Sequence, residues 1–173
     1  MASTTPSISR RMAQFALSLR YDQIPKPSLK EAKRFLLDSV GCALAALDHD
    51  DMQQAYEYVQ AVGGREQSTV IGHGTRTNMP NAALMNSLLV RAMDYNDIYW
   101  MQDPSHPSDI IPAALAVGEH MKKSGAEILT AILIAYEIEM RLCEFAVPGV
   151  RERGWHHATL TQFASPFAAG KLL

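Results

Sequence analysis

The sequence predicts an all-α domain with at most a short β-hairpin or strand. Apolar residues recur at steps of three or four in most segments, which is the period of an amphipathic helix. Two Ser-x-x-Glu patterns, beginning at Ser28 and Ser124, are typical of capping boxes that open helices. The one strand-like run, residues 68–71, is too short to support a sheet alone.

A single domain accounts for nearly the whole chain. Residues 1–9 are rich in Ser and Thr and are expected to form a flexible tail, followed by a helical domain over residues 10–173. The chain has 173 residues and 47% hydrophobic content, enough for a core of its own or for part of a larger domain. The predicted helices cover residues 8–19, 29–47, 52–62, 79–92, 110–123, 125–147 and 159–173.

Polar side chains and breakers mark the ends of these helices. Four side chains are expected to cap the free N–H groups at helix starts: Ser28, Asn78, Asp109 and Ser124. Gly63 and Gly64 end the third helix, and Pro166 is expected to disturb the last one. Residues 128–138 are apolar almost all round, so this stretch is expected at the centre of the domain.

Charge and composition exclude several classes of partner. The net charge is −2, from 16 basic and 18 acidic residues, which gives no footprint for nucleic acid. The N-terminus lacks the apolar core of a signal peptide, and the apolar run 128–136 is too short to span a bilayer. Cys42 and Cys143 lie in apolar patterns without CxxC spacing, which indicates two reduced core thiols. We therefore expect a soluble, cytoplasmic protein.

The candidate site is the polar stretch between the fourth and fifth predicted helices. His106 stands just before a helix start, where free N–H groups and the helix dipole favour a bound anion. A neutral histidine beside a bound carboxylate can transfer a proton near pH 7. Asp94 lies about one helical turn from Asp97, and such a pair can raise one pKa or orient a histidine. The pattern predicts proton transfer on an acidic substrate.

Judged from the spacing of these residues alone, a purely structural role is as well supported as a catalytic one. Asp94, Asn96 and Asp97 can simply end one helix while Asp109 caps the next. The adjacent pair His156 and His157 is a second, weaker candidate. No metal ion or cofactor is predicted: the sequence has no phosphate-binding glycine loop, and the pair His49-Asp50 lacks the further ligands of an HD-type metal centre.

Three sequence motifs are distinctive: Arg-Ala-Met-Asp-Tyr-Asn-Asp at 91–97, Ser-His-Pro-Ser-Asp at 105–109, and Pro-Ala-Ala-Leu-Ala-Val-Gly-Glu at 112–119. They resemble the signature of the MmgE/PrpD family, which includes 2-methylcitrate dehydratase and cis-aconitate decarboxylase. Residues 37–42 and 70–74 also look like the family's early landmarks, so the resemblance covers nearly the whole chain. It implies an all-α N-terminal domain carrying part of a metal-independent active site without a cofactor, and usually a homodimer.

The resemblance also assigns roles to residues. The family's catalytic acid and first histidine fall on Asp94 and His106, and its second histidine falls on His156 or His157, because two registers are possible. The twelve-residue spacing from Asp94 to His106 looks more like the dehydratase branch than the decarboxylase branch. Four residues are expected to bind the substrate, namely Asn96, Asp97, Ser108 and Arg151, of which Arg151 can bind a carboxylate.

Two departures from the family pattern leave three functions open. Ile98 stands where many relatives have a hydroxyl, and the chain stops at Leu173, before the second α+β domain that supplies basic residues in the family. The first expectation is a hydro-lyase acting on a 2-methylcitrate-like tricarboxylic acid, as a fragment or as one subunit of a split enzyme with a companion polypeptide. The alternatives are a decarboxylase or epimerase acting on a related polycarboxylate such as cis-aconitate, and a non-catalytic helical interaction or dimerisation module.

Overall fold

The computed structural model describes residues 6–173 and is mainly helical, as predicted. Within that range seven α-helices follow one another: α1 Ile8–Ser18, α2 Lys26–Ala45, α3 Asp50–Val62, α4 Met79–Arg91, α5 Ile111–His120, α6 Gly125–Glu144 and α7 Thr161–Leu172. Three short 3-10 helices connect them: η1 Tyr21–Gln23, η2 Pro107–Ile110 and η3 His157–Leu160. Residues 1–5 of the predicted tail lie outside the described range, and Ser7 already caps α1 by accepting a hydrogen bond from the N–H of Arg10.

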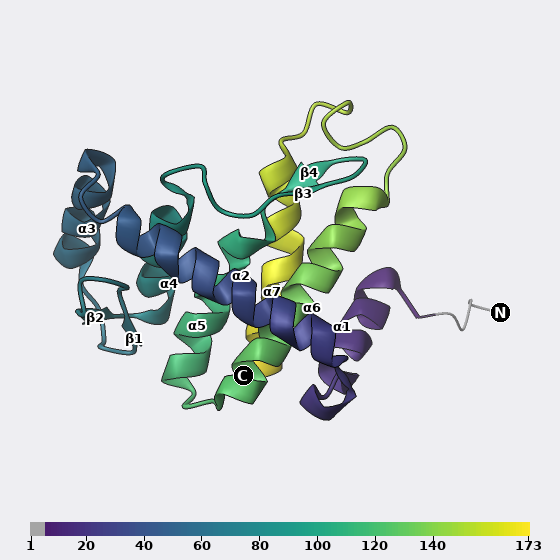
Figure 1. Ribbon diagram of the computed structural model, residues 1–173, viewed down its shortest axis with the longest axis horizontal. Helices are drawn as coiled ribbons and strands as arrows, with labels where there is room; N and C mark the ends of the chain where they lie inside the picture. Colours follow the sequence, from purple (N-terminus) through teal and green to yellow (C-terminus); the bar gives the residue numbers. More distant parts are fainter. Residues whose placement is uncertain (1–5) are drawn as a thin grey trace.

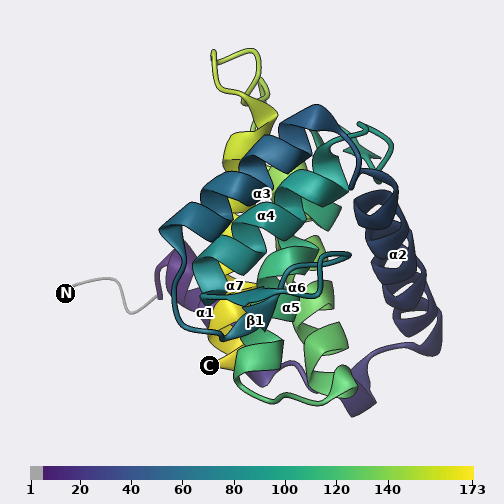
Figure 2. The ribbon, with the colours of Figure 1, turned by 90° about the vertical axis from the view of Figure 1, so that its left-hand side faces the viewer.

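Helix α6 is the centre of the domain, as its apolar sequence predicts. It packs against α5, α7 and α2, and α2 runs obliquely across α4 and α6 (Figure 1). The side chains of Ile132, Ile134 and Ile138 are buried in the main cluster, together with Ala164 and Ala168 of α7. A second cluster lies between α2, α3 and α4, where α3 and α4 run side by side (Figure 2). None of the helices in residues 6–173 combines the length and apolar character needed to cross a membrane.

Two very short antiparallel strand pairs complete the fold. Strand β1 (Ser68–Thr69) lies in the predicted strand-like segment 68–71 and pairs with β2 (Arg76–Thr77), which lies after that segment; Ser68 is opposite Thr77. Strand β3 (Tyr99–Trp100) pairs with β4 (Pro104–Ser105), with Tyr99 opposite Ser105. The second pair lies within the candidate site and was not expected, because its strands carry too few residues to show a period.

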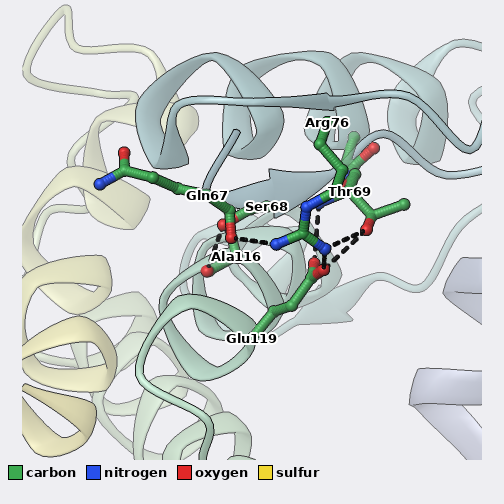
Figure 3. A network of polar contacts seen from close by, with 7 residues as sticks. Gln67, Ser68, Thr69, Arg76, Ala116 and Glu119 are labelled. Carbon is green, nitrogen blue, oxygen red and sulfur yellow. Dashed lines mark hydrogen bonds and ion pairs between the residues drawn. The ribbon is translucent and has the colours of Figure 1, made fainter. Parts of the chain in front are cut away.

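The β1–β2 hairpin is fixed to the end of α5 by one carboxylate (Figure 3). Glu119 accepts hydrogen bonds of 2.7 Å from both the N–H and the hydroxyl of Thr69, and it forms an ion pair with Arg76. Ser68 donates to a carbonyl of α5 at 2.6 Å, and Asn86 of α4 donates to the carbonyl of Thr69 at 3.0 Å. These contacts give the motif residue Glu119 a structural task away from the candidate site.

The predicted helix caps have different outcomes. Asn78 caps α4 and Ser124 forms a capping box with Glu127, as predicted. The Ser28 cap is wrong, because α2 already begins at Lys26 and places Ser28 inside its first turn. Pro27 does not prevent this early start, since the first N–H groups of a helix have no partner to lose.

Three further predictions concern the Asp109 cap, Pro166 and the two cysteines. The Asp109 cap is wrong, because Asp109 lies inside η2 and its carboxylate faces a side chain instead. Pro166 lies within α7, which continues through it. Cys42 and Cys143 are buried with free thiols, as predicted.

Candidate active site

The predicted polar stretch folds back on itself between α4 and α5. Helix α4 ends at Arg91, and Asp94 adopts a left-handed backbone conformation with φ of 50° that turns the chain away from the helix axis. The β3–β4 pair then reverses the chain direction and returns it to η2. Residues 94–97 and 105–109, separate in sequence, are thereby brought together.

The side chain of Asn96 connects residues on both sides of the β3–β4 pair through hydrogen bonds. Its side-chain amide donates to the hydroxyl of Ser108 at 2.8 Å and to the carboxylate of Asp109 at 3.1 Å. Its amide oxygen accepts from the guanidinium of Arg91 at 3.1 Å. Both Asn96 and Ser108 are buried, so these bonds satisfy polar groups that would otherwise destabilise the fold.

Asp97 fixes the orientation of His106. Its two carboxylate oxygens accept from the hydroxyl of Tyr136 at 2.8 Å and from the N–H of Ser108 at 3.1 Å. Its backbone carbonyl lies 2.6 Å from Nδ1 of His106. A carbonyl oxygen can only accept, so Nδ1 carries the proton, and Nε2 of the neutral ring has a free lone pair.

The second histidine region lies beside His106. The ring centroids of His106 and His157 are 5.7 Å apart, and those of His156 and His157 are 4.2 Å apart. His157 is half-buried, and burial, with the neighbouring His156 and His106, lowers its pKa. His156 is exposed, and its Nδ1 accepts from the N–H of Ala158 at 3.2 Å at the start of η3. Of the two predicted registers, the one at His157 therefore places a ring next to His106.

Charged groups lie on both sides of the histidines. Asp94 forms an ion pair with Arg91, and its hydrogen bond to that guanidinium lowers its pKa, which keeps the carboxyl ionised; its side chain is 78% exposed. Arg151 is exposed and lines an open pocket of about 410 Å³ together with Trp155, His156 and His157. A cation and two imidazoles around one pocket suit a carboxylate ligand.

Two acids beneath the site are difficult to ionise. Burial raises the pKa of Asp109 to about 6 and that of Glu139 to about 7. Glu139 is fully buried in α6, where one carboxylate oxygen accepts from the hydroxyl of Ser105 and the other has no partner. A neutral Glu139 avoids placing a charge in the core.

Helix α6 supplies site residues that the sequence analysis missed. Tyr136 was treated as part of the apolar stretch 128–138 and Glu139 was not considered, yet their side chains hydrogen-bond Asp97 and Ser105. Their three-residue spacing places them on one face of α6, and a carboxyl on an otherwise buried face is the signal that indicates them. No group of three His, Cys, Asp or Glu side chains in residues 6–173 is arranged to hold a metal ion.

Comparison with known proteins agrees with this arrangement of motifs. The sequence profile of the MmgE/PrpD N-terminal domain matches residues 10–173. The chain belongs to the MmgE/PrpD family.

Family members of two enzyme types are similar to the chain. It is 29% identical to cis-aconitate decarboxylase from Aspergillus terreus over 96% of its own length and 35% of that protein. It is 27% identical to a cis-aconitate decarboxylase-like protein from Aspergillus oryzae, over 98% of its own length and 37% of that protein. It is 24% identical to 2-methylcitrate dehydratase from Escherichia coli, over 90% of its own length and 34% of that protein. The chain thus spans about a third of the length of these MmgE/PrpD proteins.

Proposed function

We propose that this chain carries the acid–base part of the active site of a lyase that acts on a di- or tricarboxylic acid. The observation that carries the proposal is the fixed orientation of His106, whose Nδ1 is held by the carbonyl of Asp97 while His157 lies beside its ring. The proposed reaction is loss of water from a 2-methylcitrate-like substrate, as in the dehydratase branch of the family, in a cytoplasmic enzyme.

In this reaction Nε2 of His106 removes the proton from the carbon next to a substrate carboxylate. The electron pair of the broken C–H bond forms the double bond as the hydroxyl group leaves with a proton as water. His157, or His156 in the other register, supplies a second proton-transfer group at the leaving side. Asp94 stays ionised beside Arg91 at the rim of the site, where its negative charge stabilises the imidazolium that forms when His106 takes the proton.

Binding is divided between direct and indirect contacts. Arg151 faces the pocket that His156 and His157 line, so its guanidinium binds a substrate carboxylate. The polar side-chain atoms of Asn96, Asp97 and Ser108 already bond within the protein, so they support binding by holding the shape of the segment. The chemistry needs no cofactor and no metal ion in this scheme.

The proposal includes a partner for this chain. A tricarboxylic acid needs more than one cation, and Arg91 is committed to Asp94 and Asn96. The matched relatives are about three times as long as this chain. Further basic groups then come from a C-terminal domain of a longer chain, from a companion subunit, or from a second copy in a homo-oligomer.

A second candidate is decarboxylation of cis-aconitate or a related acid, with epimerisation as a variant. The identity to cis-aconitate decarboxylase from Aspergillus terreus, at 29%, is higher than that to 2-methylcitrate dehydratase from Escherichia coli, at 24%. The same histidines would then protonate the carbon from which carbon dioxide leaves. Ile98, which stands next to Asp97 where many relatives have a hydroxyl, is exposed. Its side chain forms no hydrogen bond, so it cannot help to discriminate between 2-methylcitrate and cis-aconitate.

The test is turnover of 2-methylcitrate and of cis-aconitate by the chain, alone and mixed with its companion polypeptide. We expect His106→Ala to lower kcat by at least about 100-fold, and His157→Ala to have a larger effect than His156→Ala. The matched control is His49→Ala, an exposed histidine before α3, which should leave kcat unchanged. Absence of turnover under every condition, with folded protein, would favour the non-catalytic interaction module.

A further inference from the structure

Asp103 is a buried acid whose contacts connect the two histidine segments. Asp103 lies between β3 and β4 and is only 1% exposed. Its backbone N–H donates a hydrogen bond to the carbonyl of Cys143 at 2.9 Å. One carboxylate oxygen accepts from the N–H of Val150 at 2.8 Å, and the other accepts from the N–H of Arg151 at 3.2 Å. The hairpin that leads to His106 is thereby bonded to the loop that leads to His157.

These two bonds have physical weight because a buried carboxylate is stable only when donors replace its water. Two consecutive N–H groups pointing at one carboxylate also fix the local path of the backbone, here at the residue that carries the Arg151 guanidinium. Other bonds of the loop are internal turns, such as those from the N–H groups of Arg153 to Gly149 and of Trp155 to Val150. Internal turns shape the loop without placing it against the rest of the site.

Gly149 provides an independent sign that this contact is built into the fold. A Cβ added at Gly149 would lie 2.7 Å from one carboxylate oxygen of Asp103 and 2.9 Å from the other. Real Cβ atoms do not approach so closely, so any side chain at Gly149 must displace the carboxylate. The loop therefore passes Asp103 at a distance that only glycine permits.

We propose that Asp103 is a positioning residue that sets Arg151 and His157 against His106. The proposal rests on the function proposed above for these three residues. Arg151 lines both the pocket shared with the histidines and a neighbouring one of about 340 Å³ beside Trp100, so a shift of the loop changes both openings. Asp103 acts through Val150 and Arg151 and takes no part in proton transfer.

The test compares Asp103→Ala, Asp103→Asn and Gly149→Ala with the control Asp48→Asn, an exposed acid before α3. The first readout is the pKa of His157, which is measured by an NMR titration of its ring. Burial and the nearby His156, His106 and Arg151 lower this pKa, so release of the loop should move it up toward 6.5. The second readout is kcat/KM, which should fall about 10- to 100-fold through misplacement of the loop.

The expected order of effect is Asp103→Ala first, then Asp103→Asn, which keeps one acceptor, with no effect for the control. An unchanged His157 titration in folded Asp103→Asn and Gly149→Ala would overturn the proposal, whatever the activity. Loss of the native fold in both of these variants would also overturn it, because Asp103 would then serve stability alone. The NMR titration needs no turnover, so it tests the positioning role of Asp103 even where the proposed lyase activity is absent.

Discussion

The segments that carry His106 and His157 are held in opposite ways. The first, residues 94–109, is bonded to helix α6 through Tyr136 and Glu139, and its residues 103–108 are buried. The second, residues 145–157, is mostly exposed and is joined to the first through Asp103. Figure 1 shows both at the same end of α6. One histidine is thus positioned by the core and the other by a surface loop.

This difference separates two kinds of contribution to the proposed site. Buried hydrogen bonds in the first segment fix the tautomer and the ring of His106, and removing any of them exposes an unsatisfied group to an apolar interior. The second segment has few such bonds apart from those to Asp103, so its exposed side chains can change with little cost to folding. Substitutions in the first segment should therefore lower stability, whereas those in the second should mainly alter binding.

Among substitutions that test the difference between the two segments, Asp97→Ala is expected to have the largest effect on stability. The change leaves the hydroxyl of Tyr136 and the N–H of Ser108 without their acceptor, which should lower the free energy of unfolding by about 4 kcal/mol. Chemical denaturation measures the loss. Asp97→Asn keeps the shape and one acceptor, so its cost should be clearly smaller. A cost of Asp97→Ala below about 0.5 kcal/mol, as for an ordinary surface substitution, would show that the carboxylate is not the anchor.

A somewhat smaller effect concerns the pH dependence of stability through Glu139. Its pKa is about 7 in the folded protein against 4.5 for the free group, so between these values the folded state binds more protons than the unfolded state. Stability from this group is therefore present below pH 4.5 and is lost as pH rises through 7. The full loss is about 3 kcal/mol, from about 1.36 kcal/mol per pKa unit.

Glu139→Gln should remove this loss while keeping an acceptor for Ser105. Unfolding measured from about pH 5 to 8 should show a flatter profile, with the variant more stable than the native protein at the upper end of that range. Asp109, with a pKa of about 6, keeps its own contribution in both proteins. The control is Glu137→Gln on an exposed part of α6, and a slope unaltered by Glu139→Gln would contradict burial as the cause.

The smallest effect on stability is expected in the second segment. Arg151→Ala removes an exposed guanidinium but keeps the N–H that Asp103 accepts from, so the free energy of unfolding should change by less than about 0.5 kcal/mol. KM for the carboxylic acid should nevertheless rise, because a cation at the pocket is lost. Arg10→Ala, an exposed arginine of α1, is the control for both measurements. A large loss of stability would mean that the two segments are held alike.

Local sequence patterns were sufficient to predict the helical framework and to single out the polar stretch that forms the candidate site. Apolar residues at helical spacing and the caps at Asn78 and Ser124 depend on local interactions, which neighbouring residues specify. The motif run from Asp94 to His106 was recognisable for the same reason, because its residues are close in the chain. The Ser28 and Asp109 caps failed because several start points compete locally, and the packing of the helix decides among them.

Which polar groups meet depends on the tertiary structure alone. Tyr136 and Glu139 lie more than thirty residues from the acid and the hydroxyl that they hold, and Asp103 lies 47 residues from Val150. No local pattern encodes these pairs, since they arise when α6, the β3–β4 hairpin and the loop after α6 pack together. The choice of His157 beside His106 has the same origin. Burial also sets the pKa values of Asp109 and Glu139, because desolvation depends on the surrounding fold and not on adjacent residues.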